Sequence, residues 1–545
     1  FLAFTDREEE ITVISRRNFL AGAAAVPFLS YAGLLPAIAA GRQDILVVAM
    51  QLDNMTSLDP HESFEAVGSE ICNNMYQRLV HPSFENPEKI EGGVASSWEA
   101  DAEGKVYTFK IDPEAKFATG NQITAEDAAF SLHRAIKMNK GPAFIIGQFG
   151  LTPENVEQAV VANNDAGTLT ISLETPTSLS FLLYCLSSSV GSIVEKKIVM
   201  ENASGDDLGN GWLQKNSAGS AEWTLAAWKP SESVMLNLNP HGAYKGNVKR
   251  IVLRHVADPS SQLLMLQKGD VDIARNLTSE QLRVIQNDEN FTLVRKGVAG
   301  IGLMSLNQKV EKLTNPKLWE AIKWAIDYKG IQENIVPLTH QQHQTIIPEG
   351  FPGAVNDLPF QKDTAKAKAL MAEAGLADGF SVSMDHYSAQ PWPDIAQAIQ
   401  ANLADIGIKL ELRAAENRQV LTKMRAREHE IALTSWGSDY FDPNTNADVF
   451  CNVTDLSDDA KTKPFAWRSN YQNADFAKKS LAARDEKDPA TRVKLYEDLQ
   501  REFMNNSPFV VMLQTVMTAA CRKDVTGMRL GVLSDSHSYA GIAKA

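Results

Sequence analysis

The sequence predicts a mixed α/β fold divided into more than one domain. The chain has 545 residues, which is too many for a single hydrophobic core. Apolar residues make up 44% of it and charged residues 22%, as in ordinary globular proteins. Short apolar strands alternate with amphipathic helices along the chain, and this alternation is typical of α/β proteins.

The first 40 residues have the pattern of an export signal. The residues Arg16 and Arg17 precede an apolar stretch at 21–38, and Ala37 with Ala39 supplies a small-residue cleavage pattern. The paired arginines resemble a twin-arginine signal. No cysteine lies at the junction, so a lipid anchor is not expected. These features predict a periplasmic protein.

Charge and cysteine content narrow the function classes. The formal net charge is −14 and no basic block occurs, which excludes a typical nucleic-acid-binding surface. In an oxidising periplasm the four cysteines could form up to two disulfides, with three possible pairings if both form. They are Cys72, Cys185, Cys451 and Cys521. No metal-ligand spacing is present, so we expect neither a metal nor another cofactor.

The first half of the chain predicts strands, helices and one hairpin. Residues Tyr107, Phe109 and Ile111 alternate along one face of a strand, and Thr124 with Asp127 predicts a capping box at the start of a helix. The other expected elements are strands at 44–50, 168–173 and 249–256, helices at 70–80 and 260–268, and a hairpin over 221–238.

The second half repeats the alternation with clear helix boundaries. Asn315 is a predicted N-cap followed by Pro316, and Gly375 and Gly407 are predicted to end helices. Residues Ile395, Ile399, Leu403 and Ile406 recur at helical spacing and predict a buried stripe. The remaining expected elements are strands at 301–307, 408–412, 430–436 and 508–513, and helices from 315, from 363, over 392–406 and over 491–504.

The segment 433–450, LTSWGSDYFDPNTNADVF, is the candidate binding segment. It follows a predicted strand and places Asp439 among Trp436, Tyr440 and Phe441. A carboxylate taken from water is costly unless it is paired. An acid in an aromatic wall at the carboxyl end of a strand therefore predicts a site for a cationic group.

Several blocks, in order, resemble the large peptide-type solute-binding proteins of ABC importers, the family of dipeptide-, oligopeptide- and nickel-binding proteins. They cover nearly the whole chain after the export signal. The blocks are YQRLV, ASSWEADAEGKVYTFKI, ITAEDAAFSLHRA, AAWKPSESVMLNLNPHGAYKGNVKRIVLRHV, LQKGDVDI, WEAIKWAIDYKGI, TAKAKALMAEAGLADGF and WGSDYFDP.

The resemblance implies a two-lobe clamshell of the periplasmic-binding-protein type, type II, with mixed sheets. Residues 42–299 and 511–545 form lobe 1, and 300–510 form lobe 2. An extra subdomain at about 81–165 belongs to lobe 1. Two strands ending near Asn307 and Gln514 cross between the lobes. The implied partners are a small peptide or similar solute and an inner-membrane permease, with the binding protein a monomer.

The resemblance also implies the role of the candidate binding segment. In peptide-binding relatives, the Asp of a W-x-x-D motif takes the α-amino group of the ligand, and here that residue is Asp439. The arginine that clamps the carboxylate in dipeptide binders is missing, because Ser388–Pro391 stand at that place. The implied ligand-binding residues are Asp439, Trp436, Gly437, Ser438, Tyr440, Met304, Asn307, Tyr387, Trp392 and Gln514. Backbone at 304–307 and at 437–438 is expected to pair with peptide amides.

Three functions stay open at this point. The first is binding of oligopeptides or related amino-bearing solutes; the second is binding of a metal chelate, opine or sugar; the third is a periplasmic hydrolase or chaperone on the same fold. The sequence lacks the G-x-S-x-G, H-E-x-x-H and G-x-x-x-x-G-K-[ST] motifs, so no enzyme is expected. His340 and His343 lie in a polar segment that predicts a solvated loop, and His386 lies either in the pocket or in a loop.

Overall fold

The computed structural model describes residues 43–545, which form one compact unit. The predicted export signal falls in residues 1–42, outside the described residues. Within 43–545, no helix is both long enough and apolar enough to span a bilayer. The predicted mixed α/β fold is confirmed, because helices alternate along the chain with the strands of an 11-stranded sheet.

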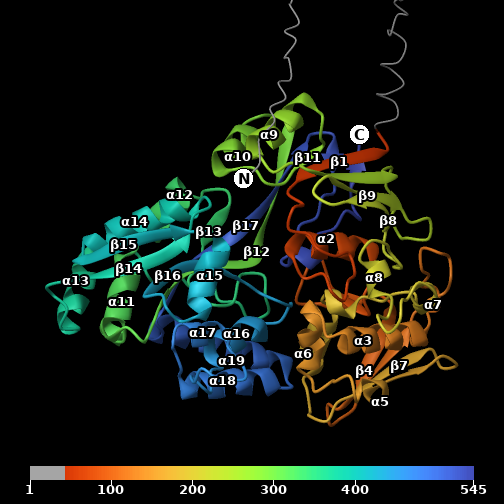
Figure 1. Cartoon of the computed structure of the whole chain (residues 1–545), viewed down its shortest axis with the longest axis horizontal. Helices are drawn as coiled ribbons and strands as arrows, with labels where there is room; N and C mark the ends of the chain where they lie inside the picture. Colours follow the sequence, from red (N-terminus) through yellow and green to blue (C-terminus); the bar gives the residue numbers. More distant parts are fainter. Residues whose placement is uncertain (1–42) are drawn as a thin grey trace, which may run out of the picture. The chain divides into compact units, whose positions relative to one another are not determined.

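Strands and helices follow one another throughout this unit (Figure 1). The strands are β1 Ile45–Met50, β2 Val80–Pro82, β3 Ile90–Gly92, β4 Ala95–Ala100, β5 Val106–Ile111, β6 Val160–Asn163, β7 Thr168–Ser172, β8 Trp223–Lys229, β9 Ser233–Leu238, β10 Arg250–His255, β11 Ile273–Ala274, β12 Phe291–Leu306, β13 His340–Gln342, β14 Phe380–Tyr387, β15 Ile408–Ala415, β16 Ile431–Gly437, β17 Phe509–Arg522, β18 Val525–Thr526 and β19 Ala543–Lys544. The α-helices are α2 Ala66–Met75, α3 Ala125–Met138, α4 Phe144–Gly147, α5 Val156–Ala159, α6 Leu179–Leu186, α7 Lys196–Glu201, α8 Asn210–Leu213, α9 Pro259–Lys268, α10 Ser279–Gln286, α11 Pro316–Ala325, α12 Tyr328–Asn334, α13 Thr364–Glu373, α14 Trp392–Ala404, α15 Asn417–Arg425, α16 Asn444–Cys451, α17 Phe465–Arg468, α18 Ala474–Asp485 and α19 Pro489–Asn506.

The local signals for helix ends are confirmed. Thr124 and Asp127 form the predicted capping box of α3, and the Asn315 side chain accepts a hydrogen bond from the Lys317 N–H at the start of α11. Gly407, after α14, has a φ of +90°, a conformation that glycine adopts without strain. These short-range patterns therefore set the boundaries of the helices that flank the sheets.

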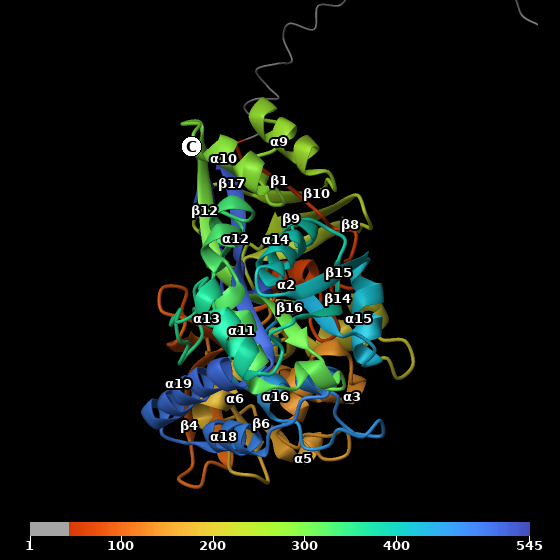
Figure 2. The same ribbon diagram turned by 90° about the vertical axis from the view of Figure 1, so that its left-hand side faces the viewer.

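The two longest strands, β12 and β17, form the centre of the large sheet. They pair antiparallel from Phe291 opposite Arg522 to Ser305 opposite Phe509, and both views show them side by side (Figures 1 and 2). The sheet order is β15-β14-β16-β12-β17-β11-β1-β10-β9-β8, with β13 on β17. Both strands are much longer than the sequence predicts. The apolar pattern marks only their buried parts, while the first half of β12 is partly exposed.

One side of this sheet brings three parallel strands together. β14 pairs parallel with β15 and with β16, and α14 and α15 provide the connections. The carboxyl ends of parallel strands share one edge of a sheet, where open α/β folds bind ligands. Tyr387 ends β14 and Gly437 ends β16, so the segment that carries Asp439 starts at this edge.

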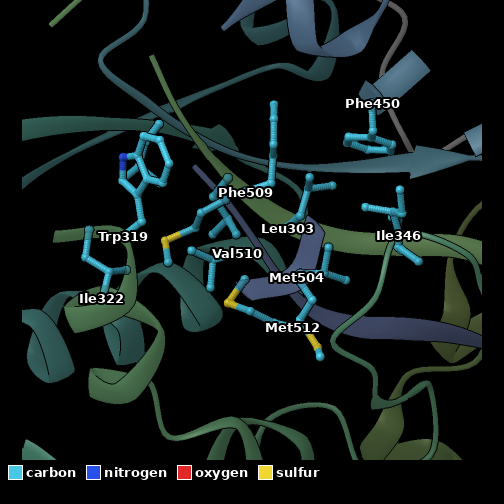
Figure 3. Close-up of a cluster of buried hydrophobic side chains, with 14 of the residues drawn as sticks. Leu303, Trp319, Ile322, Ile346, Phe450, Met504, Phe509, Val510 and Met512 are labelled. Carbon is cyan, nitrogen blue, oxygen red and sulfur yellow. The ribbon is translucent and has the colours of Figure 1, made fainter. Parts of the chain in front are cut away.

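A separate four-stranded sheet, β4-β5-β7-β6, packs against α3. The residues predicted to alternate along β5 face its core: Tyr107 and Phe109 are fully buried, and Ile111 is 4% exposed. The largest hydrophobic cluster lies instead around β12, β17 and the helices α11 and α19 (Figure 3). The predicted stripe of α14 belongs to this cluster, because Ile395, Ile399 and Leu403 are fully buried there.

The possibility of disulfides is not realised in the structure, and the expectation that His340 and His343 lie in a solvated loop is wrong. The four cysteines form no disulfide and are all buried free thiols. His340 and His343 lie in or next to β13 and not in a solvated loop, with exposed fractions of 9% and 2%. Burial lowers the pKa of each imidazole to about 4. The segment looked exposed because its Gln and Thr side chains are polar, yet Gln344 and Thr345 satisfy their polar atoms inside the core.

A buried ion pair joins three distant parts of the chain. The guanidinium of Arg275 donates two hydrogen bonds to the Glu70 carboxylate, at 2.6 and 3.1 Å. The Tyr539 hydroxyl donates a third at 2.6 Å. Burial opposes the charge on Glu70, but Arg275 and its other neighbours outweigh burial and hold the pKa of Glu70 below its ordinary value. This contact fixes α2 and the C-terminal segment to the end of β11.

Replacing Arg275 with Met is expected to lower the free energy of unfolding by about 3–5 kcal/mol at pH 7, because Glu70 is left buried without its partner. Urea unfolding followed by tryptophan fluorescence measures this loss. Arg254→Gln, at an exposed position on β10, is the control and should change stability by less than about 0.5 kcal/mol. A loss below about 1 kcal/mol for Arg275→Met would contradict the structural role given to the pair.

Candidate functional site

The loop after β16 holds Asp439 in a defined place. Ser438 N–H donates to the Ala299 carbonyl at 2.9 Å, and Asp439 N–H donates to the Thr445 hydroxyl at 3.0 Å. The Ser438 hydroxyl also donates to the side chain of Asn446, at 2.8 Å. The backbone of Asp439 is thus tied to β12 and α16, and its side chain is free to meet a ligand.

The carboxylate of Asp439 has no ion pair and no side-chain hydrogen bond within residues 43–545. Burial raises its pKa from 3.8 to about 6, and the charge of Arg468 lowers it only in part. Burial therefore makes the charged form of this acid less favourable than it is in water. An ammonium group placed beside it would stabilise the charged form by an ion pair.

A cavity of about 350 Å³ opens next to this carboxylate. Its lining residues are Phe144, Gly147, Gln148, Asp439, Tyr440, Thr445, Asp448 and Val449. Phe144 is 46% exposed and meets Phe64, itself 37% exposed, edge to face at a ring distance of 5.9 Å. An exposed aromatic ring therefore lines the same cavity as the carboxylate, and a second exposed ring packs behind it, an arrangement that suits a ligand with a cationic group and an apolar body.

Trp436, near the end of β16, packs against the core cluster next to the loop. Its ring contacts Phe450 and Phe465, at centroid distances of 6.3 and 5.5 Å. Its indole Nε1 is buried and has no hydrogen-bond partner within the described part of the chain. The guanidinium of Arg468 lies 5.8 Å from the Trp436 ring. The Trp436 side chain therefore has a cationic neighbour, Arg468, and an N–H donor of its own without a partner.

The other residues predicted for the site lie either in the loop that carries Asp439 or near the carboxyl end of β14. Gly437 is exposed and pairs with Gly300, and Tyr440 is 4% exposed but lines the cavity. Tyr387 and Trp392 meet edge to face at 5.4 Å, near the carboxyl end of β14. The positive charge of Arg468 acts to lower the pKa of both Tyr387 and Asp439, against the larger effect of burial. His386 is buried, and its Nδ1 lies 2.9 Å from the Tyr387 carbonyl.

The structure places Met304, Asn307 and Gln514 inside the protein. Met304 and Gln514 are fully buried, and Asn307 is 1% exposed. Strand addition at 304–307 is ruled out, because β12 is already paired there with β16 and β17. The Asn307 side chain donates to the His429 carbonyl, and Gln514 bonds to Val298 and Glu349. The polar groups of Asn307 and Gln514 are therefore used in hydrogen bonds within the fold.

The sequence did not reveal two residues that bear on Asp439. Phe144 lines the same cavity, and the charge of Arg468 acts to lower the pKa of Asp439. Each belongs to a segment without a recognisable motif, and only the fold brings these segments near the loop. Within residues 43–545, no group of three or more His, Cys, Asp or Glu side chains is arranged to hold a metal ion.

Asp439→Asn is expected to stabilise the unliganded protein. The carboxyl has a pKa near 3.8 when exposed and about 6 in the fold, so the folded state prefers it protonated. Its ionisation costs stability as the pH rises from about 4 to 6; the shift corresponds to about 3 kcal/mol, which solvent screening of this partly exposed group reduces to about 2 kcal/mol above pH 6. Asn removes that cost.

Urea unfolding of ligand-free protein at pH 7.5 and at pH 4 tests this expectation. The gain for Asp439→Asn should be present at pH 7.5 and nearly absent at pH 4. The control Asp459→Asn changes an exposed aspartate further along the chain and should have little effect at either pH. If Asp439→Asn is no more stable than the wild type at pH 7.5, the carboxylate is not held in the unfavourable surroundings described above.

Residues 89–458 match a family described as bacterial extracellular solute-binding proteins, family 5. The probable D,D-dipeptide-binding periplasmic protein DdpA of Escherichia coli K12 is 28% identical over 495 residues, covering 90% of this chain and 92% of DdpA. The glutathione-binding protein GsiB of Salmonella typhi is 24% identical over 514 residues, covering 92% of this chain and 95% of GsiB.

Solved structures have the same fold. The periplasmic binding protein DppA of Helicobacter pylori, in complex with the peptide STSA, is 22% identical with a TM-score of 0.73, covering 93% of this chain and 99% of DppA. The substrate-binding protein CtaP of Listeria monocytogenes is 17% identical with a TM-score of 0.78, covering 92% of this chain and 99% of CtaP. The predicted two-lobe binding-protein fold is thereby confirmed. The chain belongs to family 5 of the bacterial extracellular solute-binding proteins.

Proposed function

We propose that this protein is the periplasmic binding component of an ABC importer and captures small peptides or related amino-bearing solutes. The observation that carries the proposal is the unpaired carboxylate of Asp439 beside a cavity of about 350 Å³. The related DdpA is described as a probable D,D-dipeptide-binding protein, and the DppA of Helicobacter pylori was solved in complex with the peptide STSA. An α-amino group is the cation that these ligands share.

In this proposal the ligand ammonium forms an ion pair with Asp439. Phe144 and Phe64 cover the apolar part of the ligand from one side, and Trp436 covers it from the other. An aromatic face attracts a cation through its quadrupole, which adds to the ion pair. The aromatic rings also exclude water, and this strengthens the attraction between the ammonium and the carboxylate.

Closure of two lobes around the solute completes the proposed mechanism. We assign 42–299 and 511–545 to lobe 1, with a subdomain at about 81–165, and 300–510 to lobe 2, so that β12 and β17 cross between them. Crossing strands allow a hinge motion. A ligand that contacts both lobes favours the closed state, and the permease would recognise this loaded form. Export by the twin-arginine route as an unanchored monomer belongs to the same proposal.

Native mass spectrometry with a synthetic peptide library of two to five residues tests the proposal. The wild type should retain intact peptides, and an N-acetylated library should not be retained because its ammonium is blocked. Asp439→Ala should weaken binding of a retained peptide by about 2–5 kcal/mol in calorimetry, whereas Asp459→Ala should leave it unchanged.

Three results would contradict the proposal. Equal retention of the acetylated library would show that no ammonium is recognised. Retention of a metal chelate, an opine or a sugar in place of peptides would assign another ligand class. Release of peptide fragments, where intact ligand is expected, would indicate a hydrolase.

A further inference from the structure

A second cavity, of about 320 Å³, is separate from the one beside Asp439. Its wall comes from the end of α2, the loop between β2 and β3, the residues just before β8 and the C-terminal segment 529–540. The two cavities share no lining residue, although Tyr440 lines the first and the adjacent Phe441 lines the second. The second cavity has the size of a small-molecule site and has no role in the proposed function.

Two cationic side chains in the wall of this second cavity have no counter-charge. Lys296, on β12, and Arg529, in the C-terminal segment, form no ion pair and no side-chain hydrogen bond within residues 43–545. Arg78 lines the same wall and pairs with Asp535 at 3.5 Å, yet its buried Nε has no hydrogen-bond partner in the described part of the chain. The wall therefore offers two free positive charges and an unused N–H donor, which favours an anionic ligand.

One acid of the wall limits the charge of that ligand. Glu222 has no ion pair and no hydrogen bond from another residue within residues 43–545. Burial raises its pKa, and the positive charges of His81 and Arg529 act in the opposite direction. The other two acids of the wall are paired: they are Asp535, with Arg78, and Glu91, with Lys89. Two free cations and one free acid leave one positive charge uncompensated, so a monoanion matches the cavity better than a dianion.

Apolar side chains determine what the rest of the ligand must be. The ring of Phe84 is 43% exposed and lies 5.2 Å from the Arg529 guanidinium. Phe441 and Leu533 line the same cavity. A ligand that covers these side chains removes apolar surface from water, and an aromatic ring also packs favourably against Phe84. The cavity therefore fits a molecule with a single negative charge and an aromatic body.

We infer that this second cavity binds a small aromatic monocarboxylate, with its carboxylate on Arg529 and Lys296 and its ring on Phe84. The guanidinium group has parallel N–H donors that match the two oxygens of a carboxylate, and the lysine adds a point charge. Glu222 disfavours dianions, such as a phosphate monoester, by repulsion between like charges. The site shares no residue with the cavity beside Asp439, so this inference goes beyond the proposed function and does not depend on it.

Charge selection at this site is tested by NMR titration at pH 7.5 with four probes that share a phenyl ring. They are 3-phenylpropionate, its neutral amide, the cation phenethylamine and phenyl phosphate, which is mainly a dianion at this pH. The wild type should bind 3-phenylpropionate about tenfold or more tightly than each of the other three, because only this probe matches both the charge and the apolar wall.

Substitutions in the wall separate recognition of the carboxylate from an effect on folding. Arg529→Gln, at an exposed position, and Lys296→Gln should each weaken binding of 3-phenylpropionate and leave binding of the amide unchanged. Glu222→Gln should raise the affinity for phenyl phosphate relative to 3-phenylpropionate. Lys523→Gln, at another exposed position of the C-terminal region, and Asp439→Asn should change neither ratio.

Three results would overturn the inference. Equal binding of 3-phenylpropionate and its amide by the wild type would show that the two cations hold no carboxylate. Tighter binding of phenyl phosphate would show that Glu222 does not set the charge of the ligand. Loss of 3-phenylpropionate binding in Asp439→Asn but not in Arg529→Gln would place the probe in the other cavity. None of these results bears on peptide capture at Asp439, which the peptide libraries test separately.

Discussion

The organisation of this site depends on a carboxylate that the fold desolvates without pairing. Asp439 lies beside a cavity with its backbone fixed at Ala299 and Thr445, and its side chain has no partner within residues 43–545. Such a group lowers the stability of the empty protein. A binding protein gains from this arrangement, because the ligand removes the cost and the released free energy contributes to affinity.

The surrounding structure holds the loop while leaving Asp439 itself unpaired. Three residues further on, Asp442 is fully buried and accepts two hydrogen bonds from Arg492, each of 2.8 Å. The Asn446 side chain joins Ser438 to the Ile346 carbonyl. One acid of the loop is therefore paired within the fold and the other is left unpaired, which agrees with the proposed role of Asp439 because a binding group needs a rigid support.

Local signals in the sequence were sufficient for much of the fold and for one end of the site. The capping box at Thr124, the N-cap at Asn315 and the stripe of α14 depend on neighbouring residues, and all are found in the structure. The position of Asp439 just past β16 likewise follows from the apolar strand before it and from Gly437. The lengths of β12 and β17 were not predictable, because half-exposed strand segments lack a clear apolar pattern.

Other neighbours of the loop depend on contacts between distant segments. Arg468 comes from a helix of four residues, and its guanidinium lies 5.8 Å from the Trp436 ring. No spacing rule joins this arginine to the loop that carries Asp439. Met304, Asn307 and Gln514 show the converse, since strand ends that pointed to a cleft proved to be core.

The most direct test of ligand-linked pairing at Asp439 is the number of protons released when a peptide binds. Asp439 is about half protonated at pH 6 in the empty site, and an ammonium group beside it lowers its pKa. Calorimetry in buffers of different ionisation enthalpy should therefore detect release of about half a proton per ligand at pH 6 and almost none at pH 7, where Asp439 is ionised and the peptide amino group is still mostly protonated. The release at pH 6 should disappear in Asp439→Asn. Binding without proton release at pH 6, or the same release in the variant, would contradict the pairing of the ligand ammonium with Asp439.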